Sequence, residues 1–158
     1  MTDIVPKSRR SEMMAGIKGK NTKPELLIRT SLHRMGLRYR LHDKRLPGKP
    51  DLVFPKYKAI ILVNGCFWHG HNCQLFKWPN TRKAFWHQKI GETRKRDKAN
   101  LREYQKLGWK TLTIWECAIK GRHQIGLEET IENTVRWLQF DTTDAEIRGE
   151  DQNRNEGC

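Results

Sequence analysis

The sequence contains no apolar run long enough to cross a membrane, and its beginning carries no apolar stretch. A membrane-spanning helix needs about 20 mostly apolar residues, and no such run occurs among the 158 residues. The first ten residues, MTDIVPKSRR, are polar and basic, whereas a secretion signal has an apolar centre. We therefore expect a cytoplasmic protein that does not associate with membranes.

Acidic residues are scarce, and the shortage is uneven along the chain. There are 18 acidic and 31 basic residues, which gives a net charge of +13. Residues 141–158 hold six acidic and two basic side chains, so residues 1–140 carry a net charge of +17. A domain this basic favours a polyanionic partner, because binding to phosphates releases counterions. The composition predicts a nucleic-acid-binding protein, although a solvated basic surface would have the same charge.

Cysteine is also rare, with four residues at positions 66, 73, 117 and 158. Two disulfides are possible by number, but a reducing compartment and the neighbouring histidines favour a metal. Cys66 and Cys73 bound the stretch CFWHGHNC, and a structural zinc takes four such ligands. We expect Cys117 to be the fourth ligand, while spacing leaves His69 and His71 as competing candidates. Buried free cysteines beside surface histidines are the alternative.

The hydrophobic pattern predicts an α/β domain with a mixed central sheet flanked by helices. Thr22 and Glu25 are typical of a helix start, and Gly36 of its end, with Leu26, Leu27, Leu32 and Met35 forming the apolar face. Other helices are expected at about 8–19, 82–90, 94–107 and 126–140, and strands at 37–41, 51–54, 58–64 and 110–116. We assign residues 1–140 to one domain and 141–158 to a polar, disordered tail that contains a free Cys158.

Asp51 opens an expected strand, and the following strand ends at Val63 and Asn64. Adjacent strands would bring the Asp51 carboxylate near the backbone of residues 63–64, and such oxygen ligands suit magnesium. His69 could act as the base for an attacking water, with Glu25 orienting it. Each residue also has an ordinary interpretation, as a turn residue, an exposed side chain or a helix cap.

Aromatic residues stand beside basic ones at Phe67, Trp68 and Trp86. Exposed aromatic rings can insert between base pairs, and unstacking costs least at a mismatch. Core packing is the alternative, and it is the role we expect for Trp109, Trp115 and Trp137.

Together these residues resemble the very short patch repair mismatch endonuclease family over about residues 7–140. The resemblance is carried by residues 46–51 (LPGKPD), 65–73 (GCFWHGHNC), 81–86 (TRKAFW), 96–97 (RD) and 115–117 (WEC). It implies a restriction-endonuclease-like core of the PD-(D/E)xK type with a structural zinc. It also implies a magnesium-dependent nick on the 5′ side of the thymine in a T:G mismatch, the product of 5-methylcytosine deamination. We then expect a bacterial monomer that binds duplex DNA at the nucleoid, with a mismatch-repair protein as a candidate partner.

The resemblance also implies roles for individual residues. Asp51 and the carbonyl of Val63 would bind magnesium, and His69 would be the general base with Glu25 as its hydrogen-bond partner. The implied zinc ligands are Cys66, His71, Cys73 and Cys117. The implied wedges are Phe67, Trp68 and Trp86 in the major groove and Met14 in the minor groove, with Met13 a less favoured substitute for Met14.

The chain departs from the family pattern at two positions of the site. Asn64 stands where the family has a second active-site histidine, and an amide cannot transfer a proton. Val63 replaces a threonine, which matters little if only its carbonyl is used. The glutamate-x-lysine half of the nuclease motif is absent, as the family leads us to expect.

Two other functions fit the same residues. One is a nuclease of this fold without mismatch preference, which would cut T:G and T:A duplexes equally. The other is a zinc-stabilised DNA-binding module without catalysis, which would not nick DNA in magnesium.

Overall fold

The computed structural model describes residues 22–150. The expected basic helix at 8–19, with Met13 and Met14, lies outside the described residues, as does Cys158. Within residues 22–150, none of the helices combines the length and the apolar character needed to span a bilayer.

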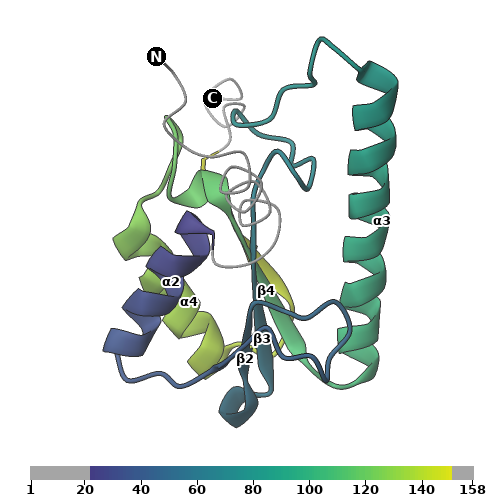
Figure 1. Cartoon of the computed structure of the whole chain (residues 1–158). Coiled ribbons are helices and arrows are strands. Elements are labelled where there is room, and N and C mark those ends of the chain that lie inside the picture. The colour runs from purple at the N-terminus through teal and green to yellow at the C-terminus, as the bar shows by residue number, and fades with distance from the viewer. Residues whose placement is uncertain (1–21, 151–158) are drawn as a thin grey trace, which may run out of the picture.

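A five-stranded mixed sheet forms the centre of the molecule (Figure 1). The neighbouring strands pair antiparallel from β1 to β3 and parallel from β3 to β5. The strands are β1 (Arg40–Leu41), β2 (Leu52–Phe54), β3 (Ala59–Asn64), β4 (Lys110–Trp115) and β5 (Ala145–Ile147), and they lie in this order across the sheet. The predicted α/β class and mixed sheet are confirmed.

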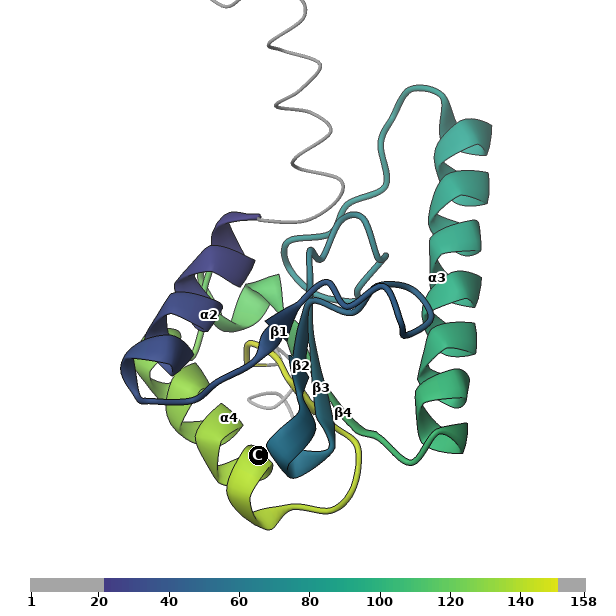
Figure 2. The ribbon, with the colours of Figure 1, turned by 60° about the horizontal axis from the view of Figure 1, so that its bottom comes forward.

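Helices cover both faces of the sheet (Figures 1 and 2). α2 (Lys23–Arg34) and α4 (Leu127–Phe140) lie on one face, and α3 (Lys83–Lys106) lies on the other. In β3, Ile61 belongs to the core beneath α2 and α4, and Ile60 packs with Tyr104 of α3. A strand covered on both faces is expected to be apolar throughout, and this accounts for the run AIILV.

α2 begins as the sequence predicts but buries a different face. The Thr22 side chain accepts a hydrogen bond from the Glu25 amide at 3.4 Å. The buried residues are Glu25, Ile28 and Leu32, which follow helical spacing, whereas three of the expected core residues are exposed: Leu26, Leu27 and Met35. The predicted apolar face of α2 was therefore wrong except for Leu32. The pattern was misleading because Glu25, a charged residue, occupies one of the buried positions.

The two helices expected at 82–90 and 94–107 form one helix, α3, of 24 residues. Gly91 lies in its middle, and a methyl group there would have no neighbour within 4 Å. A glycine inside a helix costs only about 1 kcal/mol relative to alanine, so it does not end the helix. The strand expected at 37–41 is shorter than predicted and comprises only Arg40 and Leu41.

The sequence placed the end of the ordered domain at residue 140, and this boundary was wrong. β5 pairs in parallel with β4, and its Ile147 is buried. Asp144 joins the segment to the sheet by accepting a hydrogen bond from the Thr111 amide at 2.8 Å and another from Gln105 at 2.7 Å. One apolar side chain and one carboxylate therefore order a stretch that composition alone describes as a polar tail.

We predict that Asp144→Ala lowers the free energy of unfolding by about 1–3 kcal/mol, because it leaves the Thr111 amide without its acceptor. Thr111 is 2 % exposed, so water cannot easily replace the carboxylate. Urea denaturation of the full-length chain measures the effect. Glu103→Ala is the control, because its pair with Lys106 is exposed and should contribute little. Equal effects of the two substitutions would contradict the prediction.

Candidate functional site

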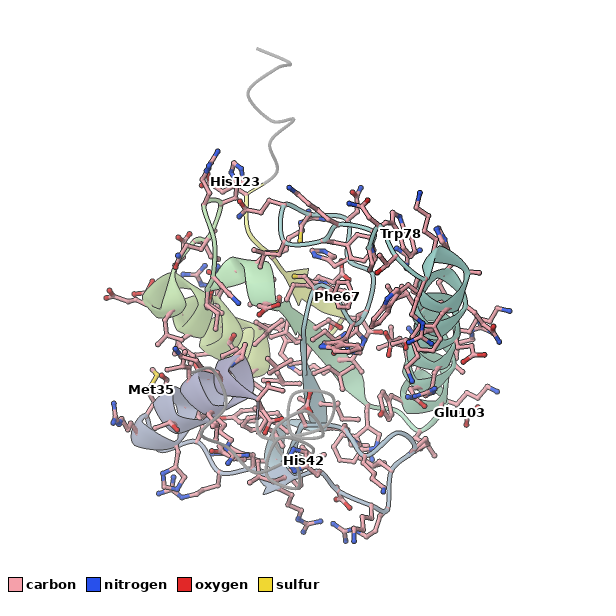
Figure 3. The ribbon with its side chains drawn as sticks, turned by 45° about the horizontal axis from the view of Figure 1, so that its top comes forward. Met35, His42, Phe67, Trp78, Glu103 and His123 are labelled. Atoms are coloured by element: carbon pink, nitrogen blue, oxygen red, sulfur yellow. The ribbon has the colours of Figure 1, made fainter. Side chains whose placement is uncertain are left out.

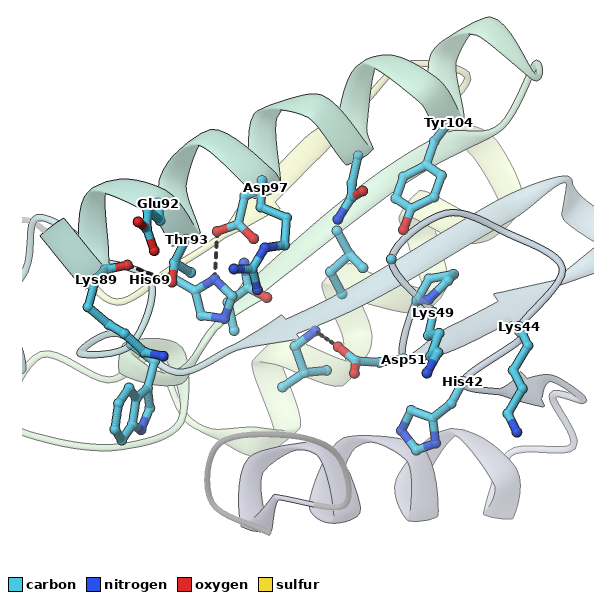
Figure 4. A pocket seen from close by; sticks show the side chains of 18 residues that line it. His42, Lys44, Lys49, Asp51, His69, Lys89, Glu92, Thr93, Asp97 and Tyr104 are labelled. Atoms are coloured by element: carbon cyan, nitrogen blue, oxygen red, sulfur yellow. Dashed lines mark hydrogen bonds and ion pairs between the residues drawn. The ribbon is translucent and has the colours of Figure 1, made fainter. Parts of the chain in front are cut away.

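A cavity of about 580 Å³ opens between the 42–51 segment, the end of β3 and α3 (Figure 4). Asp51, Val63, Asn64 and His69 line it. From the sequence we predicted that the side chains of Asp51 and His69 lie at one site, and in the structure both line this cavity. Four basic side chains also line it: Lys44, Lys49, Lys89 and Arg96. Glu92 and Asp97 line it as well, so an anionic ligand would meet these positive charges together with three carboxylates and the His69 imidazole.

Asp51 is held at the point where β2 begins. Its Oδ2 atom accepts a hydrogen bond from the Val63 amide at 2.7 Å, so the side chain bridges to the end of β3. Burial raises the pKa of Asp51 to about 7, and the nearby Glu25 carboxylate adds to the shift. An ionised carboxylate is costly in such a place without a compensating positive charge. The site is therefore suited to a cation.

Glu25 lies with Asp51 and with a histidine that sequence reasoning missed. The ligand atoms of Glu25, His42 and Asp51 all lie within 4.8 Å of one another. Glu25 is 1 % exposed and is bound by Arg29 at 2.8 Å and by Nε2 of His42 at 3.2 Å. The backbone amide of His42 also donates to the Asp51 carbonyl at 3.2 Å. His42 follows a two-residue strand, and no sequence motif distinguishes it.

His69 has a different carboxylate partner from the one expected. Its Nδ1 atom is 2.6 Å from Oδ2 of Asp97, which lies in α3 (Figure 4). We expected Glu25 in this role, but Glu25 pairs with Arg29 and His42, and in Figure 4 Asp51 lies between His42 and His69. The correction follows from the fold, because His69 turns toward α3 whereas Glu25 belongs to α2 on the opposite face of the sheet.

The Asp97 contact determines which nitrogen of His69 is available. An ionised carboxylate can only accept a hydrogen bond, so Nδ1 of His69 carries the proton. In the neutral ring, Nε2 is then the unprotonated nitrogen. The residues RD at 96–97 were part of the resemblance, but their spacing alone did not show that Asp97 faces His69.

Three cysteines and one histidine form a second cluster beyond the end of β3. The ligand atoms of the four residues lie within 4.8 Å of one another: Cys66, His71, Cys73 and Cys117. Nδ1 of His71 is 3.5 Å from Sγ of Cys66 and 3.6 Å from Sγ of Cys117. A tetrahedral zinc with ordinary bond lengths separates sulfur from nitrogen by about 3.6 Å. The cluster fits a metal, and it contains His71 and not His69.

The cluster is built into the protein by its surroundings. Cys117 lies in the short helix η2 (Glu116–Ala118), directly after β4, and its amide donates to Sγ of Cys66 at 3.3 Å. The His71 ring stacks on Trp115, with ring centres 3.9 Å apart. Hydrogen bonds from Cys66 and His71 lower the pKa of the Cys117 thiol to about 4. The geometry therefore favours a thiolate, the form that binds metals.

The three aromatic residues singled out in the sequence meet beside the cavity. The ring centre of Phe67 is 5.3 Å from that of Trp68 and 5.2 Å from that of Trp86, and Trp68 lines the cavity. Further aromatic rings continue this group: Phe76 and Trp78 on the stretch that leads into α3, and Phe85 and His87 at the beginning of that helix. Phe67 and Trp78 are labelled in Figure 3. Trp115 and Trp137 are buried as expected, and Trp109 is partly buried.

Residues 2–75 match the family model described as DNA mismatch endonuclease Vsr. The DNA mismatch endonuclease Vsr of Escherichia coli K12 is 40% identical over 147 residues, which are 93% of this chain and 94% of that protein. The type II nicking enzyme V.NmeAIP of Neisseria meningitidis is 45% identical over 122 residues, 77% of this chain and 87% of that protein. The type II nicking enzyme V.XorIIP of Xanthomonas oryzae is 41% identical over 119 residues, 75% of this chain and 88% of that protein. With the cavity at Asp51 and the cysteine cluster in place, these similarities show that the chain belongs to the Vsr family of DNA mismatch endonucleases.

Proposed function

We propose that this protein nicks duplex DNA on the 5′ side of the thymine in a T:G mismatch, by magnesium-dependent hydrolysis, and so begins repair of deaminated 5-methylcytosine. The observation that carries the proposal is the shared cavity, in which a partly buried carboxylate and a carboxylate-bound histidine lie among basic side chains. One relative is named a mismatch endonuclease, and two others are named nicking enzymes. The reaction would take place at the nucleoid of a bacterial cytoplasm, on a monomeric protein with a restriction-endonuclease-like core and with a mismatch-repair protein as a candidate partner.

Asp51 and the carbonyl of Val63 would hold the magnesium. The Val63 amide points to Asp51, and a strand residue directs its amide and its carbonyl to the same side, so this carbonyl supports an oxygen site beside Asp51. Bound magnesium would lower the pKa of its water and stabilise negative charge on the phosphate. The side chains of Glu25 and His42 lie close to the Asp51 carboxylate. We propose that Glu25 adds negative charge beside the bound magnesium ion.

His69 would act as the general base, taking a proton from the attacking water at Nε2. Asp97 would be a positioning residue, because it holds Nδ1 of His69 at 2.6 Å and so fixes the tautomer. Asn64 lines the cavity and would bind a phosphate oxygen or water through its amide, without transferring a proton.

The basic side chains around the cavity would hold the DNA backbone through its phosphates. Phe67, Trp68 and Trp86 would enter the major groove at the mismatch, where unstacking costs least. Met14, outside the described residues, is proposed as the minor-groove wedge because of the family resemblance.

We propose that the second cluster holds a structural zinc. Three cysteines and one histidine fill all four positions of a tetrahedral zinc and leave none for water or substrate. This zinc would tie the 65–73 loop to the end of β4 through Cys117 and take no part in hydrolysis.

We predict that Asp51→Asn lowers the rate of nicking in magnesium by at least about 100-fold, because it removes the charged ligand. Single-turnover nicking of a labelled T:G duplex measures this rate. Unchanged nicking would contradict the proposed magnesium site, and absence of nicking in the wild type would favour a DNA-binding module without catalysis.

Thermal unfolding of Asp51→Asn shows whether a lower nicking rate comes from the lost magnesium ligand or from misfolding. Because burial raises the pKa of Asp51 to about 7, the folded protein keeps its proton where the unfolded chain has lost it. Ionisation therefore costs stability as the pH rises from about 4 to about 7. Without metal, Asp51→Asn should unfold at the same temperature as the wild type near pH 4 and at a higher temperature near pH 8, because the amide does not ionise.

We predict that Asp97→Asn lowers the nicking rate by about 10–100-fold, because an amide no longer fixes the His69 tautomer. The variant should also shift the limb of the pH–rate profile that reports His69, which loss of fold alone would not do. Glu103→Gln, an exposed position in the same helix, is the control. An unchanged rate and profile in Asp97→Asn would refute the positioning role.

We predict that the protein nicks a T:G duplex faster than the matched T:A duplex, and that Trp68→Ala reduces this ratio. The aromatic wedge favours base steps that unstack at low cost. Parallel time courses on the two duplexes measure the ratio. Equal rates in the wild type would favour the alternative function, a nuclease without mismatch preference.

A further inference from the structure

The segment that follows β5 crosses the cysteine cluster. We call residues 148–150 the C-terminal strap. Each of its residues forms a hydrogen bond to the part of the chain that carries the cluster. The Gly149 amide donates to Sγ of Cys117 at 3.3 Å, and the Glu150 amide donates to the His123 carbonyl at 2.7 Å. The Arg148 guanidinium donates to the carbonyl of Asn72 at 2.8 Å.

The strap and the Cys117 thiol are positioned by neighbouring strands. β4 leads directly into η2, which contains Cys117, and β5 leads directly into the strap. The two strands pair in parallel, with Ile114 opposite Ile147. The indole of Trp115 adds a hydrogen bond to Glu146 at 3.3 Å. The sheet therefore sets the distance between the Gly149 amide and the sulfur.

Gly149 is required by space and not by backbone conformation. Its φ lies outside the left-handed range that favours glycine. A β-carbon at this position would lie 2.5 Å from the Cys117 carbonyl oxygen and 2.7 Å from the His123 carbonyl oxygen. Both are backbone atoms, one of η2 and one of the loop that follows it, so neither can rotate away as a side chain could. An alanine would push the strap away from Cys117 and break the hydrogen bond to its sulfur.

We propose that the C-terminal strap is part of the metal centre, with Gly149 as a positioning residue that holds the Cys117 thiolate through its amide. This inference rests on the proposed zinc at the cluster. An amide that donates to a bound thiolate orients it and withdraws part of its charge from the metal. With the strap in contact with its sulfur, Cys117 is 1 % exposed, so we expect the strap to help keep water and competing chelators from this atom. Metal release then requires the strap to separate from the cluster.

The experiment uses the full-length protein and compares Gly149→Ala with Gly91→Ala. Gly91 is the matched control, because a β-carbon there has no neighbour within 4 Å. Two properties are measured below the unfolding temperature: the rate of zinc release to a coloured chelator, and the thiolate-to-cobalt charge-transfer band of cobalt-substituted protein. We expect Gly149→Ala to release zinc at least about tenfold faster and to shift this band. Gly91→Ala should change neither.

The outcomes distinguish the inference from the proposal on which it rests. A wild-type protein that purifies with no bound zinc, and takes up none, refutes the structural zinc itself. If the wild type holds zinc and Gly149→Ala leaves the release rate and the cobalt band unchanged, the strap inference is wrong. A lower unfolding temperature with an unchanged cobalt band also refutes it, because the strap would then only support the fold.

A second variant keeps the test decisive if Gly149→Ala does not fold. Arg148→Met removes the hydrogen bond to the Asn72 carbonyl but keeps the Gly149 amide. We expect faster zinc release with a smaller change in the cobalt band. Zinc release at the wild-type rate would overturn the inference.

Discussion

The hydrogen bond from the Val63 amide to the Asp51 carboxylate joins the start of β2 to the end of β3. It holds a partly buried carboxylate at the beginning of β2 against the end of β3. The loop that follows β3 therefore starts from a fixed position. This loop contributes His69 to the cavity and three of the four ligands to the cysteine cluster. Only one residue, Gly70, separates His69 from His71, yet the first faces Asp97 and the cavity while the second faces three cysteines.

This arrangement keeps two kinds of chemistry apart within one loop. The cysteine cluster is closed by its own four side chains and by Trp115, and it suits a metal that never meets substrate. The cavity, in contrast, is lined by both carboxylates and basic side chains. A bare phosphate diester would be drawn in by the basic residues and repelled by Asp51 unless a cation came with it. The charge pattern itself thus favours a metal-dependent reaction on a polyanion.

The sequence predicts well those features that depend on residues close together in the chain. CFWHGHNC contains three ligands of the cluster, and the run AIILV marks the central strand. Asp51 and His69 could be paired because the two strands before the loop are adjacent. The spacing of histidines could not separate His69 from His71, because both lie in one loop, and only the family resemblance chose between them before the structure did.

Features that depend on the packing of distant elements were missed or wrong. Asp97 reaches His69 from the middle of a helix, and Glu25 was assigned to the wrong histidine because its helix covers the other face of the sheet. His42 shows no pattern in its neighbourhood. β5 has one buried apolar residue and gains its order from pairing with β4 and from Asp144, which composition cannot reveal.

The continuity of α3 has a mechanical consequence. Trp86 near its start and Asp97 near its middle are eleven residues apart, or about 16 Å along a helix that rises 1.5 Å per residue. No break or hinge separates them. In the proposed reaction the helix therefore fixes the distance between the inserted Trp86 ring and the histidine that Asp97 holds. The length of α3 between these two residues would then set the distance between the mispair and the cut. Adding or removing a helical turn would move the scissile bond relative to the mispair.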